Sequence, residues 1–232
     1  MKKERLLMNI AMLLGAIGAI RTGAIGTFSI FSIFFVFLTG CAVPSAPTYQ
    51  STYDFGPGPM VVQPTNRLAA LPALALAEVD ASAALDSTAV LYRLAYADAR
   101  QLQPYAQARW SMAPAQLLRQ RLREQLGLRR AMLNPGEAGA GVSPAVSAPA
   151  LLRIELEEFS QVFMTSASSV GLLRLRATVL QGSPQGERLV AQRSVIVQRP
   201  APSADAPGGV QALTAAADGA VEEIEQWLQQ LR

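Results

Sequence analysis

Hydrophobic and polar positions alternate with a period of two residues in several segments of this chain. The clearest run reads Leu173, Arg174, Leu175, Arg176, Ala177, Thr178 and Val179. Similar alternation covers residues 90–96, 152–157 and 195–199, and a short apolar run lies at 74–79. Alternation with one charged side is typical of antiparallel strands that have one solvated face. Residues 181–186, which contain two Gly and one Pro, predict a hairpin loop between the last two strands.

Two other segments repeat their apolar residues with a helical period. Pro114 suits a first helical position and Gly127 a C-terminal cap. Between them lie Leu118, Leu122 and Leu126, and we expect the opposite face to hold Arg119, Arg121, Arg123 and Glu124. A second helix is predicted from about residue 210 to 231, with one apolar stripe made of Val210, Leu213, Ala217, Val221, Ile224, Leu228 and Leu231. The predicted fold class is α+β: an antiparallel sheet with two main amphipathic helices packed on one face.

The N-terminal apolar region ends in Leu38, Thr39, Gly40 and Cys41, and Cys41 is the only cysteine of the chain. Small residues before a cysteine, after an uncharged stretch, favour a signal-peptide cleavage site. The four residues resemble the lipobox of bacterial lipoproteins, in which the thiol receives a diacylglyceryl group and the chain is cut before the cysteine. We therefore expect a covalent lipid on Cys41, a signal peptide at 1–40, and no other cofactor.

A retained transmembrane anchor is the alternative for the same region. The stretch 22–38 has 17 residues, the lower limit of the roughly 17–25 that span a bilayer. The position, the flanking residues and the uniqueness of Cys41 favour the lipoprotein. Ala42 follows the cysteine, where an Asp retains many lipoproteins at the inner membrane. We therefore predict an outer-membrane, lipid-anchored protein that faces the periplasm.

Composition after Cys41 argues against catalysis and against nucleic-acid binding. This part holds 16 Arg against 16 Asp or Glu, so its formal charge is zero and no basic patch for nucleic acid is expected. The chain has no His, and its one Cys is assigned to lipid, which removes the commonest general base and metal ligands. We expect Glu155, Glu157 and Glu158 to form a solvated strand face. The prediction is a protein that is not an enzyme and has no metal site, although a periplasmic hydrolase using Ser or Asp remains an alternative.

The mature chain divides by composition into a spacer and one domain. Residues 41–72 are rich in Pro, Ser, Thr and Gly, which is typical of a segment that cannot bury enough apolar surface to fold. The domain is predicted at 73–232, with a low-complexity insertion loop at 134–149.

Several short blocks, in this order behind a lipobox, resemble the ABC-type transport auxiliary lipoproteins, the PqiC-like group. They are Tyr53-Asp54-Phe55-Gly56-Pro57, Tyr92-Arg93-Leu94, Leu102-Gln103-Pro104-Tyr105, Ala108-Arg109-Trp110, Pro114-Ala115-Gln116-Leu117-Leu118 and Leu156-Glu157-Glu158-Phe159-Ser160-Gln161-Val162-Phe163. Phe55 stands where the family pattern has Leu, and the 134–149 insertion lies outside that pattern. The resemblance covers roughly residues 52 to 230.

The resemblance implies an auxiliary component of an ABC-type intermembrane lipid transport system. Its partners would be an MCE-type periplasmic protein and the ABC permease and ATPase, and the lipoprotein would tether or dock the assembly at the outer membrane. The alternative is a cell-envelope assembly or secretion-system lipoprotein. We also expect a homo-oligomer, because zero net charge removes self-repulsion and strand edges need to be covered.

Arg109 and Trp110 are the candidate partner-binding residues, since Arg and Trp dominate interface hot spots. The alternative is that Trp110 fills the core where a strand meets a helix. Tyr92, Tyr96 and Tyr105 are expected to pack with solvated hydroxyls.

Overall fold

The computed structural model describes residues 49–58, 71–135, 149–183 and 186–231. By contacts the chain divides into two units, Met1–Pro47 and Thr48–Arg232, and the described residues all belong to the second. The strands are β1 (Ser51–Tyr53), β2 (Leu74–Ala81), β3 (Ala89–Leu94), β4 (Leu102–Trp110), β5 (Met132–Leu133), β6 (Ala150–Phe163), β7 (Ser169–Ser183) and β8 (Gly186–Pro200). The helices are the 3₁₀ turn η2 (Ala83–Leu85), α3 (Ala95–Asp98), α4 (Pro114–Gly127) and α5 (Ala206–Gln230).

The long strand β6 organises the sheet. Strand β7 pairs with β6 along nearly its whole length, and β8 pairs with β7; both pairings are antiparallel. On its other side, β6 pairs in parallel with β2 along its first half and with β3 near its end. Strands β2 and β3 thus run along the same edge of β6 in the same direction, with η2 between them.

The α+β class is confirmed, but the sheet is mixed rather than antiparallel throughout. Strand β4 pairs with β3 antiparallel, whereas β1 pairs with β4 and β5 with β2 in parallel. The predicted antiparallel arrangement therefore holds for β6–β7–β8 and for β3–β4. Parallel neighbours need a long crossover connection. Between β2 and β6 the chain passes through β3, β4 and α4 before it returns, which gives β6 a parallel partner.

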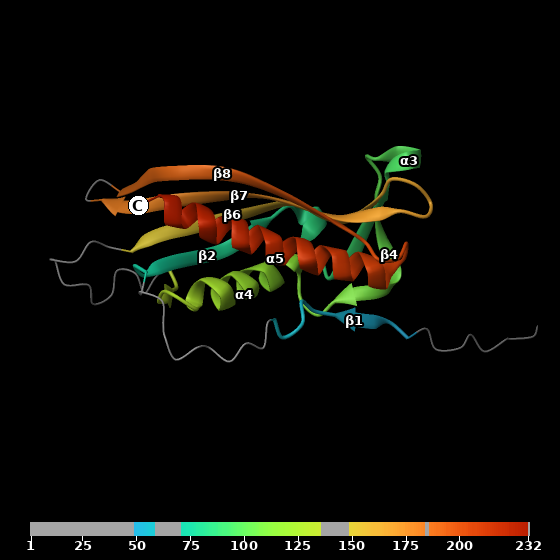
Figure 1. Ribbon diagram of the computed structural model, residues 1–232, viewed down its shortest axis with the longest axis horizontal. Helices are drawn as coiled ribbons and strands as arrows, with labels where there is room; N and C mark the ends of the chain where they lie inside the picture. Colours follow the sequence, from blue (N-terminus) through green and yellow to red (C-terminus); the bar gives the residue numbers. More distant parts are fainter. Residues whose placement is uncertain (1–48, 59–70, 136–148, 184–185, 232) are drawn as a thin grey trace, which may run out of the picture. The chain divides into compact units, whose positions relative to one another are not determined.

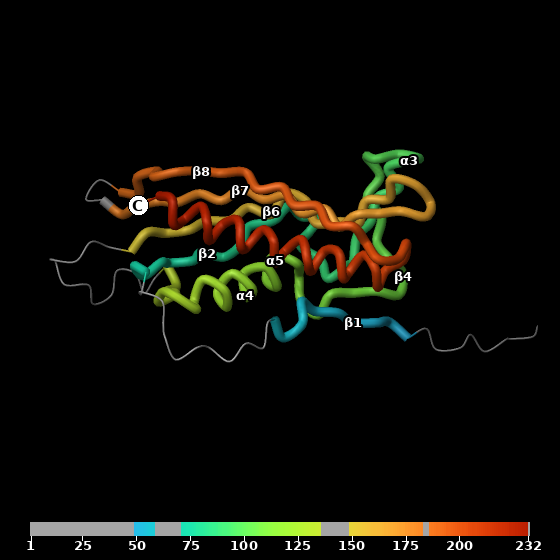
Figure 2. Tube along the Cα trace, in the orientation of Figure 1, coloured from blue at the N-terminus to red at the C-terminus, as the bar shows by residue number. Residues whose placement is uncertain are grey.

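The two predicted helices are confirmed. Helix α4 begins at Pro114 as predicted, but it includes Gly127, and Leu128 is its C-cap. It packs against β2, while α5 lies across β6, β7 and β8 (Figure 1; Figure 2). Helix α5 begins at Ala206, a few residues before the predicted start, because the Asp205 carboxylate accepts a hydrogen bond from the backbone N–H of Gly208. Gly171 of β7 lets α5 approach closely, since a Cβ there would lie 2.6 Å from the backbone of Ala212.

The predicted spacer at 41–72 is wrong for the residues around 51–58, which are part of the folded unit. Strand β1 pairs with the end of β4, and the side chain of Phe55 is only 7% exposed. Strand pairing and a buried aromatic side chain therefore hold this Pro- and Gly-rich segment on the domain. Residues 59–70 of the spacer and 136–148 of the predicted insertion lie outside the described residues.

Candidate functional site at the N-terminal junction

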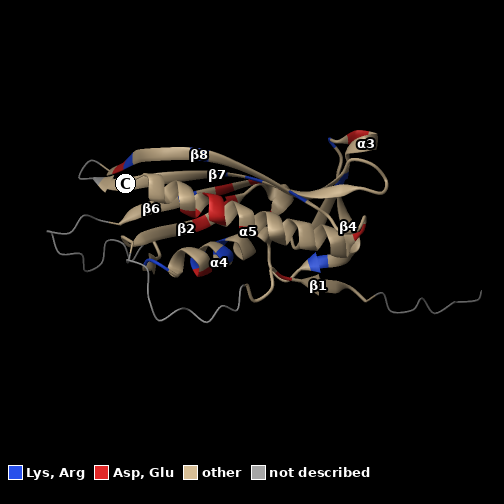
Figure 3. Ribbon diagram, in the orientation of Figure 1, with Lys and Arg blue, Asp and Glu red and all other residues tan. Residues whose placement is uncertain are grey.

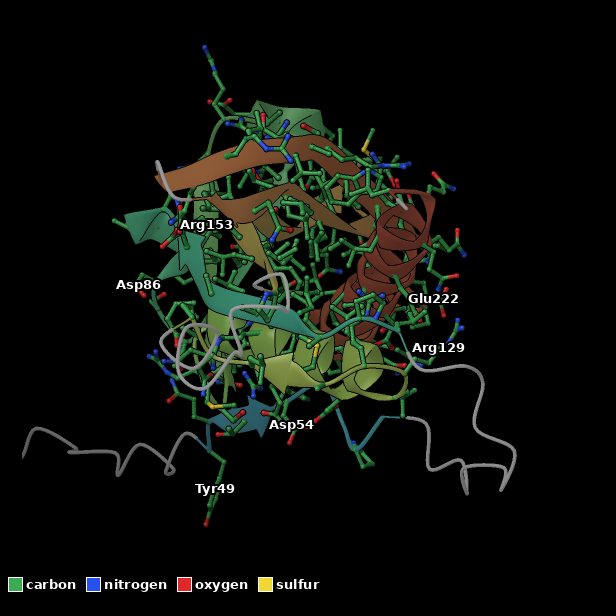
Figure 4. All side chains as sticks on the ribbon, turned by 90° about the vertical axis from the view of Figure 1, so that its left-hand side faces the viewer. Tyr49, Asp54, Asp86, Arg129, Arg153 and Glu222 are labelled. Carbon is green, nitrogen blue, oxygen red and sulfur yellow. The ribbon has the colours of Figure 1, made fainter. Side chains whose placement is uncertain are left out.

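The predicted lipidation site lies outside the described residues: Leu38, Thr39, Gly40 and Cys41 all precede Tyr49, where the description begins. Within the described part of the chain, no helix is both long and apolar enough to cross a membrane. The segment that would link the lipid to the domain enters it through β1. Figure 4 shows Tyr49 pointing away from the domain, with Asp54 closer to it just after β1.

An aromatic cluster holds this segment on the domain. The ring of Phe55 meets Trp110 of β4 edge to face, with centroids 5.6 Å apart, and lies 5.9 Å from Phe159 of β6. The rings of Trp110 and Phe159 are also 5.6 Å apart, and Trp110 is 2% exposed. Aromatic pairs of this geometry are stabilising beyond their buried area. The cluster therefore joins the N-terminal segment to the centre of the core.

The structure separates the two candidate partner-binding residues. The side chain of Arg109 is exposed, while that of Trp110 is buried in the core cluster. Neighbouring residues of a strand point to opposite faces, so the two side chains cannot present one common surface. Trp110 matches the alternative interpretation of a core residue, and Arg109 is the member of the pair that a partner can reach.

Arg121 of α4 connects the N-terminal segment to both long helices. Its guanidinium donates to the backbone carbonyls of Phe55 and Gly56, and its Nε lies 3.2 Å from Oδ1 of Asp218 on α5. A longer contact of 3.8 Å joins its Nη1 to Glu124. The prediction that Arg121 points away from the core is wrong, since this side chain is 2% exposed. The repeat of Leu118, Leu122 and Leu126 in α4 could not reveal this. The groups that contact Arg121 lie in the segment after β1 and on α5.

The environment of Asp218 opposes its charge. Burial raises the pKa of this carboxyl above 3.8, and the neighbouring Glu222 and Glu124 carboxylates act in the same direction. The positive charge of Arg121 lowers the pKa but does not outweigh burial. A hollow opens beside Arg121, lined in part by Asp54, Gln120 and Glu124.

A second set of buried polar groups lies where β3, β4, β6 and β7 meet. Glu158, 7% exposed, accepts two hydrogen bonds from Arg93, at 3.3 and 2.9 Å, and one from the Ser160 hydroxyl at 2.6 Å. Charged donors and a bidentate fork make such bonds strong. The prediction of a solvated face is therefore wrong for Glu158, which a β-bulge next to Leu156 separates from the regular alternation.

The fully buried Gln161 continues this polar set. Its Oε1 accepts a 2.7 Å hydrogen bond from the hydroxyl of Tyr105, and its Nε2 donates one of 2.7 Å to the Ser169 hydroxyl. Burial, followed by the nearby Tyr92, raises the pKa of Tyr105 above its ordinary value. The hydroxyl of Tyr92 donates to Gln103. The hydroxyls of Tyr92 and Tyr105 are therefore used inside the protein, contrary to the expectation of solvated hydroxyls, whereas Tyr96 is exposed.

The remaining carboxylates of β6 belong to a surface ladder of ion pairs. Glu157 lies 2.7 Å from Arg176 and 3.4 Å from Arg174, and Glu155 lies 3.6 Å from Arg176. Each of these carboxylates lies beside a guanidinium of the neighbouring strand β7. In the described parts of the chain, no group of three or more His, Cys, Asp or Glu side chains is arranged to hold a metal ion.

The domain is similar to known proteins in both sequence and fold. A family model described as the ABC-type transport auxiliary lipoprotein component matches residues 53–225. The chain is similar in fold to a crystal structure from Xanthomonas campestris, with a TM-score of 0.60 at 23% identity, over 78% of this chain and 96% of the other. A second structure, of an uncharacterized protein, gives a TM-score of 0.54 at 14% identity over 78% and 99% of the two chains. No curated protein matches the sequence.

The match begins at Tyr53 in β1 and ends inside α5, so it includes the Phe55 cluster, Arg121 and the whole sheet from β2 to β8. At these identities the two solved structures agree with the chain in fold, and the family model adds the class of protein. The chain belongs to the family of ABC-type transport auxiliary lipoprotein components.

Proposed function

We propose that this protein is an outer-membrane lipoprotein that docks an MCE-type, ABC-driven lipid transport assembly at the outer membrane. The observation that carries the proposal is the family match, which begins at the point where the segment after Cys41 joins the fold. The lipobox residues Leu38, Thr39 and Gly40 would direct cleavage, the lipid on Cys41 would supply the attachment, and the domain would supply recognition. The proposed role is binding rather than catalysis.

The proposed mechanism combines a short tether with a rigid attachment. Nine residues, 42–50, separate Cys41 from β1, and a fully extended chain of that length reaches at most about 30 Å. Acyl chains on Cys41 would anchor stably, because more than one chain is added. Force on the tether would be received by β1, Phe55 and the carbonyls that Arg121 binds. The partner must therefore cross most of the periplasm itself.

The proposed partners are an MCE-type periplasmic protein and, through it, the ABC permease and ATPase. A homo-oligomer of the lipoprotein would match a ring-shaped partner and gain affinity through multiple contacts. Strand β8 supports this part of the proposal, since among the strands of the described sheet it pairs with β7 alone and leaves a 15-residue edge. Such an edge is a template for a further strand.

The experiment is crosslinking in intact cells followed by purification of the tagged full chain. We expect an MCE-type protein to co-purify with the wild type. Enrichment of secretion or outer-membrane assembly components instead would favour the alternative class. If no transport component follows the tagged chain, the proposal is wrong.

A Cys41→Ala variant tests the attachment separately. We expect it to remain uncut by the lipoprotein peptidase and to lose labelling with a fatty-acid analogue. Normal cleavage and membrane retention of this variant would instead support a transmembrane anchor.

A further inference from the structure

Three connections of the sheet gather at one end of the domain: residues 95–101, 164–168 and 201–205. Leu94 and Phe163 are partners in the parallel pair β3–β6, so α3 and the β6–β7 loop leave the sheet side by side. The link from β8 to α5 begins here too, because Pro200 is the partner of Val170 and the Ala201 N–H donates to Ser169. In Figure 1 and Figure 2 these segments lie at the right-hand end of the domain.

This end carries two exposed large apolar side chains. Tyr96 of α3 is 52% exposed, and Met164, directly after β6, is 59% exposed. We call residues 95–101 and 164–168 the apolar tip. The rest of the β6–β7 loop consists of Thr165, Ser166, Ala167 and Ser168, and the loop has no charged residue (Figure 3).

The charges near the tip are few and are engaged with one another or with the backbone. Asp98 lies 3.1 Å from the Nε of Arg100. Asp205 caps α5 and accepts from Ser203. Transfer of an unpaired charge from water to an apolar phase is costly. Contact of the tip with such a phase does not require that transfer, because the charges near the tip have partners.

The tether leaves the domain toward this same end. Strand β4 leads away from α3, and β1 pairs in parallel with its last three residues, so the chain before Ser51 continues back along β4, where the Gln50 side chain donates to the Ala106 carbonyl. Figure 1 agrees, since β1 enters from the right-hand side. With nine residues between Cys41 and β1, a lipid on Cys41 would keep Ser51, which begins β1, within about 30 Å of the bilayer.

We propose that the apolar tip contacts the membrane interface, with Tyr96 and Met164 entering the headgroup region of the lipid layer that holds the anchor. Tyrosine is enriched at this depth because its ring is apolar and its hydroxyl is polar. Two side chains bind a bilayer weakly by themselves, but a short tether raises their effective concentration and makes a weak contact persistent. This proposal rests on the proposed lipidation of Cys41.

The contact would fix the orientation of the domain. With the tip on the membrane, the opposite end, which holds the β7–β8 turn around Gly186, faces the periplasm. Strand β8 then presents its open edge along the direction from the membrane to the partner. A transport protein would meet the far end and the β8 edge rather than the tip.

The unique cysteine makes the test direct. In the lipidated protein the thiol of Cys41 is blocked, so Met164→Cys introduces one reactive thiol for an environment-sensitive fluorophore. Ile196→Cys on β8 is the matched control, because Ile196 is 57% exposed against 59% for Met164 and lies away from the tip. Both full-length variants are reconstituted in phosphatidylethanolamine–phosphatidylglycerol vesicles, with and without lipids brominated near the headgroup.

We expect the probe at residue 164 to shift to the blue and to lose most of its emission to brominated lipid, while the probe at 196 keeps a water-like spectrum. Adding Tyr96→Ser should weaken the quenching at 164. A water-like, unquenched probe at 164 overturns the tip contact even if an MCE-type protein co-purifies. A quenched probe at 164 without any co-purifying transport protein keeps the tip contact and rejects the docking function. If the intact mass of the protein shows no lipid on Cys41, both the tip contact and the docking function are wrong.

Discussion

Two regions of the domain are stabilised in different ways. The regular half, made of β6, β7, β8 and α5, consists of long antiparallel strands under a helix, with apolar residues at every second strand position. The junction half, made of β1, β3, β4 and α4, combines a few aromatic rings with charged groups, chief among them Arg121, which is buried, and Arg93, which pairs with Glu158 of β6. The regular half depends on a repeated pattern, and the junction half on individual side chains.

This difference concerns how much a single residue matters. In the regular half, α5 contacts the sheet through many small and medium side chains, including Ala212, Ala216, Ala217 and Ala220. The loss of one contact there leaves its neighbours in place. In the junction half, Phe55 is buried in the core, Tyr53 packs against the core beside it, and Arg121 binds the carbonyls of Phe55 and Gly56. We therefore expect the mutations with the clearest local effect to lie at the junction.

The largest expected effect belongs to Trp110→Ala. Removal of this buried ring leaves a cavity between Phe55 and Phe159, and large-to-small changes of this kind cost about 3–5 kcal/mol. The exposed neighbour Arg109→Ala should change the free energy of unfolding by less than about 0.5 kcal/mol. Urea unfolding of the two variants measures both. Equal, small losses would mean that Trp110 is not a core residue and that the junction is looser than described.

The regular half could be predicted well because its signals are local. The predicted α5 stripe from Val210 to Leu228 is buried in the structure. Helix α4 of the junction half shares this property, because Pro114 and Gly127 marked its two ends. The alternation at 173–179 predicted the strand β7, and the Gly- and Pro-containing residues 181–186 predicted the hairpin between β7 and β8. Each of these elements is defined by residues that are near one another in sequence.

The junction half could not be predicted in the same way, because its determinants are distant in sequence. Arg121 and Phe55 are 66 residues apart, and Arg93 and Glu158 are 65 apart. Strand β4 has exposed Pro104 and Gln107 within it, which weakens its alternation. Parallel pairing of β2 and β3 with β6 depends on the path of the chain rather than on local pattern. The lipobox was evident in sequence but lies outside the described residues, so it remains a prediction.

A smaller effect, confined to the N-terminal segment, is expected from Arg121→Met. The substitution removes the donors to the carbonyls of Phe55 and Gly56, and unsatisfied buried groups cost about 1–3 kcal/mol. Limited proteolysis should cut near residue 56 faster than in the wild type. The matched control is Gln120→Met on the exposed side of the same helix turn, which should not change the cutting rate. Unchanged proteolysis of Arg121→Met would show that the aromatic contacts hold the segment without the arginine.

The smallest expected effect is a pH dependence at Asp218. Its pKa is raised in the folded state, chiefly by burial, so folding is favoured by the protonated carboxyl. That contribution is fully present below 3.8 and is lost as the pH rises through the folded pKa. Asp218→Asn mimics the protonated form, so the wild type should lose stability relative to this variant as the pH rises above 3.8. The reverse trend would mean that the ion pair with Arg121 outweighs burial.

Docking through the lipid is tested most directly by measuring where the proposed MCE-type partner is located, rather than where the lipoprotein is located. Inner and outer membranes are separated from cells carrying wild-type protein or Cys41→Ala, and the partner is quantified in each fraction after crosslinking. We expect a share of the partner to fractionate with the outer membrane in wild-type cells and this share to be lost with Cys41→Ala. An unchanged distribution of the partner in the variant would contradict the claim that this lipoprotein docks the assembly through its lipid.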